Sequence, residues 1–138
     1  MRPIVVYVLT LVVMLPLDAV WLSTTGGTLY RDSMGNLLKA QFDIVPAVAF
    51  YLVYVFGVTV LVTLPALKAA QPNAVSALVR GAVFGLAAYA TYDLTALSVV
   101  RDWPLPLSLI DMAWGTALTG VASGVAVFLM ARFKPKAV

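Results

Sequence analysis

The sequence predicts an all-α membrane protein, in which a four-helix transmembrane bundle carries a short interfacial helix between helices 1 and 2. The first observation is composition: 62% of the 138 residues are hydrophobic and 11% are charged, against about 45–50% and about 25% in soluble domains. The second is four apolar runs of roughly 20 residues, the length that crosses a hydrocarbon core of about 30 Å. Because backbone groups in lipid must bond internally, these runs are expected to be helices, and we interpret residues 1–138 as a single transmembrane domain.

The predicted transmembrane helices cover residues 4–22, 44–67, 78–100 and 107–131. The first is interpreted as a retained helix and not a signal peptide, because no small-x-small cleavage motif follows it and it contains Pro16, Asp18 and Trp21. Residues 23–27 are expected to form a flexible exit. After them, apolar side chains recur at helical spacing within residues 30–41, which predicts a short amphipathic helix lying on the membrane surface.

Local signals support these boundaries. Asp43 stands directly before the second apolar run, where its side chain can cap the first turn of a helix. Two pairs of glycines lie four residues apart, Gly81 with Gly85 and Gly120 with Gly124. Small residues at this spacing allow helix backbones to approach closely, so both pairs are predicted to pack helices within the bundle.

The composition excludes several kinds of chemistry. The chain has no Cys and no His, and its six acidic residues are all Asp. Thiol chemistry and imidazole ligation of haem or zinc are therefore ruled out. A metal site built from Asp18, Asp93 and Asp111 would offer only oxygen ligands, which suit Mg²⁺, Ca²⁺ or Mn²⁺. Their spacing forms no local metal motif, so we predict no metal site and leave the cofactor open.

The basic residues predict the orientation of the bundle. With four helices, the N-terminus, the second loop and the C-terminus lie on one side, which holds six basic residues against three on the other. The positive-inside rule then places both termini in the cytoplasm. The same spread over termini and loops explains the net charge of +3 without a nucleic-acid partner; the expected partner is the lipid bilayer.

Three aspartates lie inside the apolar runs, where a carboxylate is costly and marks a functional site by default. At about 1.5 Å rise per residue, Asp18 and Asp93 reach similar depth in the outer half of the bundle, with Asp111 about a turn nearer the surface. Aromatic side chains and one basic residue surround this layer. The predicted ligand-binding residues are Asp18, Trp21, Tyr89, Tyr92, Asp93, Arg101, Asp111 and Trp114.

Three functions remain open at this point. The preferred hypothesis is binding or transport of a small ligand, a lipid or an ion by this outer-leaflet cluster. The alternative is a structural or accessory subunit of a larger membrane complex or homo-oligomer, whose aspartates bond across helices and only fix their packing. The third is an intramembrane lipid-modifying enzyme using a pair of carboxyl groups. We lean against an enzyme and assign no catalytic residue.

Three motifs in order resemble the DUF2177 family of small bacterial membrane proteins. They are Leu17-Asp18-Ala19-Val20-Trp21-Leu22, Tyr89-Ala90-Thr91-Tyr92-Asp93-Leu94-Thr95, and Trp103-Pro104 followed by Asp111-Met112-Ala113-Trp114-Gly115-Thr116. The resemblance covers nearly the whole chain and implies a bacterial inner membrane location, but no mechanism. The family's acids match Asp18, Asp93 and Asp111, whereas Ala96 replaces an Asn of the family pattern.

Overall fold

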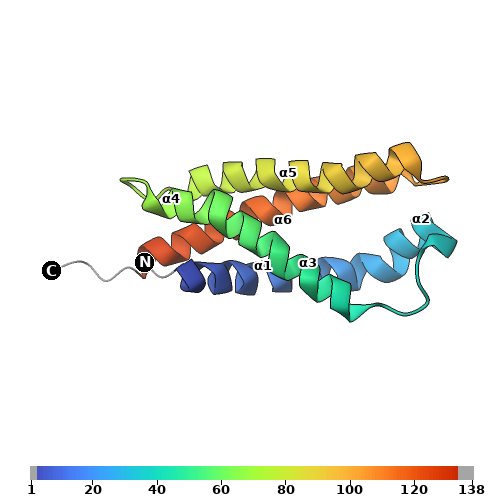
Figure 1. Ribbon diagram of the computed structural model, residues 1–138, viewed down its shortest axis with the longest axis horizontal. Helices are drawn as coiled ribbons and strands as arrows, with labels where there is room; N and C mark the ends of the chain where they lie inside the picture. Colours follow the sequence, from blue (N-terminus) through green and yellow to red (C-terminus); the bar gives the residue numbers. More distant parts are fainter. Residues whose placement is uncertain (1–2, 134–138) are drawn as a thin grey trace.

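A computed structural model describes residues 3–133 and confirms the predicted fold class: within that range the chain is helical and contains no strand. Four helical segments are long and apolar enough to cross a membrane: Pro3–Leu37, Ile44–Lys68, Ala74–Val99 and Leu105–Arg132. Figure 1 shows them lying lengthwise side by side, with the start of α1 and the end of α6 at the same end. The opposite end carries α2 and the connection between α5 and α6.

The first segment is longer than the sequence predicted. α1 spans Pro3–Thr25 and continues through a π-helical turn, Gly26–Tyr30, into α2, Arg31–Met34, and a 3-10 turn, Gly35–Leu37. The expected flexible exit at residues 23–27 is therefore wrong. In this stretch the hydroxyl groups of Ser23, Thr24 and Thr25 donate to carbonyls of the preceding turn, so these polar side chains find partners within the helix.

The second segment contains a π-helical turn as well. α3 spans Ile44–Val58, the turn covers Thr59–Thr63, and α4 spans Leu64–Lys68. Asp43 caps α3 as predicted, since its side chain accepts a hydrogen bond from the backbone N–H of Val45. Leu64 and Pro65 follow the turn, and Pro65 has no N–H to continue the α-helical hydrogen-bond ladder.

α5 (Ala74–Val99) and α6 (Leu105–Arg132) form the most extensive helix contact in the described chain. Their antiparallel register is regular: a Cβ atom on Gly81 would meet Ser123, and one on Gly85 would meet Thr119. Added Cβ atoms on Gly120 and Gly124 would lie 3.0 and 3.1 Å from atoms of Leu78. Both predicted glycine pairs therefore pack these two helices together.

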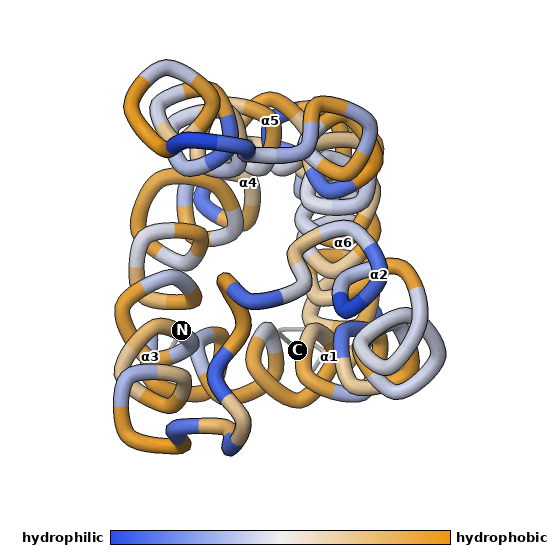
Figure 2. The backbone as a smooth tube through the Cα atoms, turned by 90° about the vertical axis from the view of Figure 1, so that its right-hand side faces the viewer, coloured by the Kyte–Doolittle hydropathy of each residue, from blue (hydrophilic) through white to orange (hydrophobic). Residues whose placement is uncertain are grey.

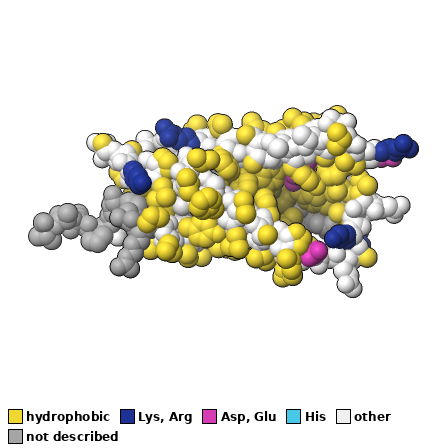
Figure 3. All heavy atoms as spheres, viewed as in Figure 1, with side chains coloured by type: hydrophobic (Ala, Val, Ile, Leu, Met, Phe, Trp, Pro, Cys, Tyr) yellow, Lys and Arg dark blue, Asp and Glu magenta, His cyan; other side chains and the backbone are white. Residues whose placement is uncertain are grey.

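The remaining packing leaves an apolar exterior. Buried side chains form two clusters, one around Met14, Val55 and Leu118 and one around Val6 and Leu67. Figure 2 shows the helices arranged around the long axis, with hydrophobic residues on their outer faces. Figure 3 shows the same apolar cover along the body of the molecule. Such an exterior is expected where lipid is the solvent.

Candidate functional site

A cavity of about 570 Å³ opens between the helices in the half of the bundle that contains the α5–α6 connection. Figure 3 shows the hollow from the side, with an acidic side chain inside it. The volume lies within the range of small-molecule sites, about 300–1,000 Å³. Its lining comes from all four segments: Asp18, Trp21, Leu22, Tyr30, Phe42, Ala47, Phe50, Tyr51, Tyr54, Ala88, Tyr89, Tyr92, Asp111 and Trp114.

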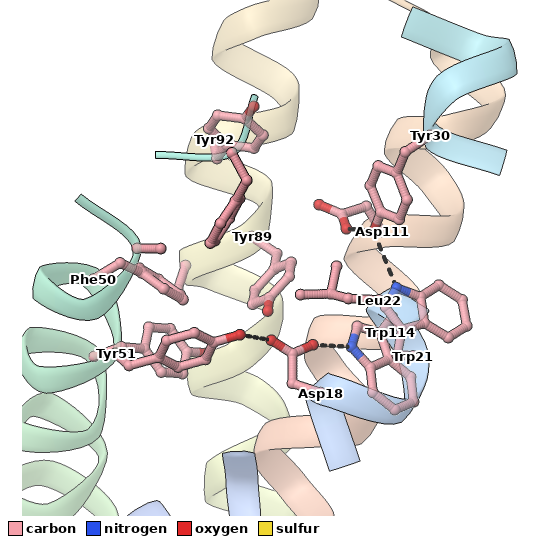
Figure 4. A pocket seen from close by; sticks show the side chains of 14 residues that line it. Asp18, Trp21, Leu22, Tyr30, Phe50, Tyr51, Tyr89, Tyr92, Asp111 and Trp114 are labelled. Carbon is pink, nitrogen blue, oxygen red and sulfur yellow. Dashed lines mark hydrogen bonds between the residues drawn. The ribbon is translucent and has the colours of Figure 1, made fainter. Parts of the chain in front are cut away.

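Asp18 on α1 is the first polar centre of the cavity. The residue is 5% exposed, and its two carboxylate oxygens accept hydrogen bonds from different helices. Trp114 on α6 donates its indole N–H to Oδ1 at 2.9 Å, and Tyr51 on α3 donates its hydroxyl to Oδ2. Figure 4 shows both contacts. A single carboxylate thus fixes three helices around the cavity.

Asp111 on α6 is the second polar centre. Its Oδ1 accepts a hydrogen bond from the hydroxyl of Tyr30, and that hydroxyl accepts one from the indole N–H of Trp21 at 3.1 Å. Trp21 in turn stacks on Trp114, with ring centroids 4.5 Å apart and planes 6° from parallel. The two carboxylates are therefore linked through a continuous set of tyrosine and tryptophan contacts (Figure 4).

Aromatic rings form the rest of the wall. Tyr54 is the deepest of them: its ring lies edge-on to Tyr89, with centroids 6.2 Å apart, and its hydroxyl shares a hydrogen bond of 2.7 Å with Thr119. Phe50 lies against both Tyr51 and Tyr54. The faces of these rings carry partial negative charge, so they add to the negative potential of the two carboxylates.

The cavity contains acids without basic partners. Within residues 3–133 the one salt bridge joins Lys39 to Asp43 at 3.6 Å, and it lies on the surface. Arg101, predicted as a ligand-binding residue, is exposed in the α5–α6 connection and does not line the cavity.

Asp93 lies behind the cavity and not in its wall. It is 2% exposed, on the α5 face that meets α6, beside Asp111 and Ser108. Its Oδ2 atom has no hydrogen-bond partner among the described residues. The sequence predicted Asp93 at the depth of Asp18, with Asp111 about a turn nearer the surface. The register of α5 against α6 instead brings Asp93 opposite Asp111, and the packing of α5 turns Asp93 toward α6 and away from the opening.

Tyr30, Tyr51 and Tyr54 were not among the predicted site residues. Tyr51 and Tyr54 lie three residues apart in the first half of the second apolar run. Residues with that spacing share a helix face, so the pair was a usable signal. Tyr30 could not have been placed, because the sequence indicated a flexible break before it. Within residues 3–133 no three acidic side chains gather closely enough to hold a metal ion.

Comparison with known proteins identifies a family. A family model described as a predicted membrane protein, DUF2177, matches residues 3–128, which is nearly the full chain. Searches of curated proteins and of solved structures found no match. The family description adds no ligand, reaction or partner, so the chemistry of the site rests on its geometry.

Proposed function

This chain belongs to the DUF2177 family of predicted membrane proteins, and from that premise we propose that it binds a small organic cation with an apolar body. The site is the cavity between α1, α3, α5 and α6. The observation that carries the proposal is the pair of buried carboxylates, Asp18 and Asp111, in an aromatic enclosure without a basic residue. An unpaired charge in a low-dielectric site is costly, and a cationic ligand relieves that cost.

The aromatic walls support a cation over a neutral ligand. A cation near the face of a Trp or Tyr ring gains about 0.5–1 kcal/mol at exposed sites and about 2 kcal/mol or more when desolvated. Trp21, Trp114 and Tyr89 line the cavity together with both acids. A quaternary or alkylated ammonium group, which needs few hydrogen bonds, suits this combination better than a strongly hydrated metal ion.

The apolar part of the lining supports a ligand with a hydrocarbon body. Leu22, Ala47 and Phe42 lie in the wall, and Phe42 is 79% exposed at the connection before α3. Below the cavity, the Tyr54–Thr119 hydrogen bond and the apolar cluster around Val58 and Leu118 close the bundle. The geometry therefore supports entry and binding of a ligand from one end of the bundle. Transport would require the packed region around Tyr54, Val58 and Leu118 to open.

We propose that the cavity faces the outside of the bacterial inner membrane, with both termini in the cytoplasm, because six basic residues lie on the terminal side against three. The chain has no native Cys, so single cysteines report the orientation directly. Ala40 and Ala70 are exposed in connections at opposite ends of the bundle. In intact cells, a membrane-impermeant maleimide is expected to label Ala40→Cys and to spare Ala70→Cys; the reverse pattern would invert the proposed orientation.

Cation binding can be measured by tryptophan fluorescence in a Trp103→Phe background, because Trp21 and Trp114 line the cavity and Trp103 does not. We expect saturable binding of octyltrimethylammonium below its micellar concentration, and much weaker binding of octyl sulfate, which has the same chain and the opposite charge. Asp18→Asn is expected to weaken cation binding at least tenfold, about 1.4 kcal/mol, because the amide removes one of the two cavity charges.

Asp32→Asn is the matched control, since Asp32 is exposed on α2 and does not line the cavity. It makes the same chemical change outside the site and is expected to leave affinity unaltered. Equal binding of the cation and the sulfate would contradict the proposal. Loss of thermal stability in Asp18→Asn without any cation binding by the parent protein would instead favour the structural-subunit alternative.

A further inference from the structure

Asp93 and Asp111 face each other across the tight contact between α5 and α6. Because the two helices are antiparallel, each step of four residues forward along α5 corresponds to four residues backward along α6. Gly81 meets Ser123, Gly85 meets Thr119, and Tyr89 meets Gly115. The next step in the same register brings Asp93 opposite Asp111, in agreement with their side-chain contact. Two acids therefore meet at the position where the small residues of the interface end.

The surroundings of this acid pair offer no positive charge. Asp93 is almost fully buried, with an unpartnered Oδ2 atom. From α6 it faces Ser108 and Asp111, and the adjacent titratable residue on α5 is Tyr92. The other titratable groups around Asp111 are Tyr30, which donates to it, and, across the cavity, Tyr89 and Asp18. No described basic side chain forms a salt bridge with either acid.

Two carboxylates in contact cannot both carry a charge at low cost, and a proton between them removes the repulsion. A metal ion is a poorer bridge here, because no third acidic ligand is close enough among residues 3–133. The two acids also differ in access: Asp111 lines the cavity, whereas Asp93 does not. A charge that enters the cavity therefore acts on the pair through Asp111.

We propose that Asp93 and Asp111 share one proton, and that a cation binding in the cavity expels it. This inference rests on the proposed function. When the cation lies beside Asp111, it replaces the proton as the positive partner of that carboxylate. The proton then leaves through the cavity to water. One positive charge enters and one leaves, so the net charge of the buried site is unchanged, and the protein acts as a cation–proton exchange site.

The shared proton can be tested without a ligand. Infrared spectra of the purified protein are expected to contain the carbonyl band of a protonated carboxyl group, shifted in D₂O. Asp93→Asn is expected to remove this band, because the amide can donate to Asp111 in place of the proton, and Asp32→Asn is expected to keep it. An absent band in the parent protein would overturn the shared proton.

The exchange is tested by calorimetry with octyltrimethylammonium in two buffers of different ionisation enthalpy. We expect the parent protein to release one proton per bound cation. Because protons compete with the cation, its affinity should rise about tenfold for each unit of increasing pH while the pair is protonated. Asp93→Asn is expected to bind the cation with no proton release and no such pH dependence.

The possible failures are distinct. If the parent protein binds no cation, the proposed function and the exchange both fall, while the infrared band still decides whether the proton is shared. If it binds the cation without releasing a proton, only the exchange is overturned. Proton release that persists in Asp93→Asn would assign the proton to another group and also overturn the exchange. The measurements on the parent protein stand even if Asp93→Asn does not fold.

Discussion

Replacing Gly85 with alanine is expected to lower the free energy of unfolding by about 3 kcal/mol, the upper end of typical overpacking costs. An added Cβ atom would lie 2.2 Å from the carbonyl oxygen of Gly115 and 2.7 Å from the hydroxyl oxygen of Thr119. The first of these is a backbone atom and cannot rotate away. The methyl group can be accommodated only if α5 and α6 move apart along their whole contact.

Gly26→Ala is the matched control, because an added Cβ atom there meets nothing within 4 Å. It makes the same chemical change in a helical turn, and we expect stability to be unchanged or slightly higher. Thermal unfolding in a mild detergent, read by circular dichroism, compares the two variants. Equal midpoints for Gly85→Ala and Gly26→Ala would contradict the close approach of α5 and α6 described above.

Gly115→Ala is expected to weaken cation binding at least tenfold, about 1.4 kcal/mol, if the proposed function is correct. An added Cβ atom would lie 2.2 Å from two ring atoms of Tyr89. Tyr89 lines the cavity, so its ring must move away from α6 and into the space that the ligand would occupy. The substitution changes the shape of the site without removing any of its polar groups.

A second substitution should reverse this effect. In the double variant Gly115→Ala with Tyr89→Ala, the ring that causes the clash is absent, so the affinity is expected to recover toward that of Tyr89→Ala alone. Gly120→Ala serves as the control on the same helix: its Cβ atom would lie 3.0 Å from the Leu78 carbonyl oxygen, and Gly120 does not line the cavity. Fluorescence titration with octyltrimethylammonium compares the affinities of these four variants. Additive losses in the double variant would show that Tyr89 does not transmit the effect.

The helices could be predicted because lipid imposes a simple requirement. Backbone groups that cannot reach water must bond within the helix, so apolar length alone locates each crossing. The cavity residues Asp18, Trp21, Asp111 and Trp114 could be brought together by depth, since rise per residue is fixed in a helix. Glycine spacing likewise located the α5–α6 contact, because only small residues permit that approach.

Rotation and side-chain bonding could not be predicted in the same way. Depth says nothing about which neighbour a side chain faces, so Asp93 was placed in the site although the packing of α5 turns it toward α6. The first helix continues through Thr24 and Thr25, whose hydroxyls bond within it, where composition indicated a break. That continuation carries Tyr30 to Asp111, a contact between residues 81 positions apart that no local pattern contains.

The length of the first helical segment gives the protein a sensitivity to bilayer thickness. Pro3–Leu37 contains 35 residues, so it is about 50 Å long if straight, whereas a hydrocarbon core measures about 30 Å. The apolar residues 4–22 of this segment alone match that core, so the polar remainder extends into the headgroup region, to a depth that changes with acyl-chain length. In short-chain lipids Tyr30 and the cavity mouth lie nearer the aqueous phase, and in long-chain lipids they lie deeper. Membrane thickness would thus set whether a ligand arrives from water or laterally from the bilayer.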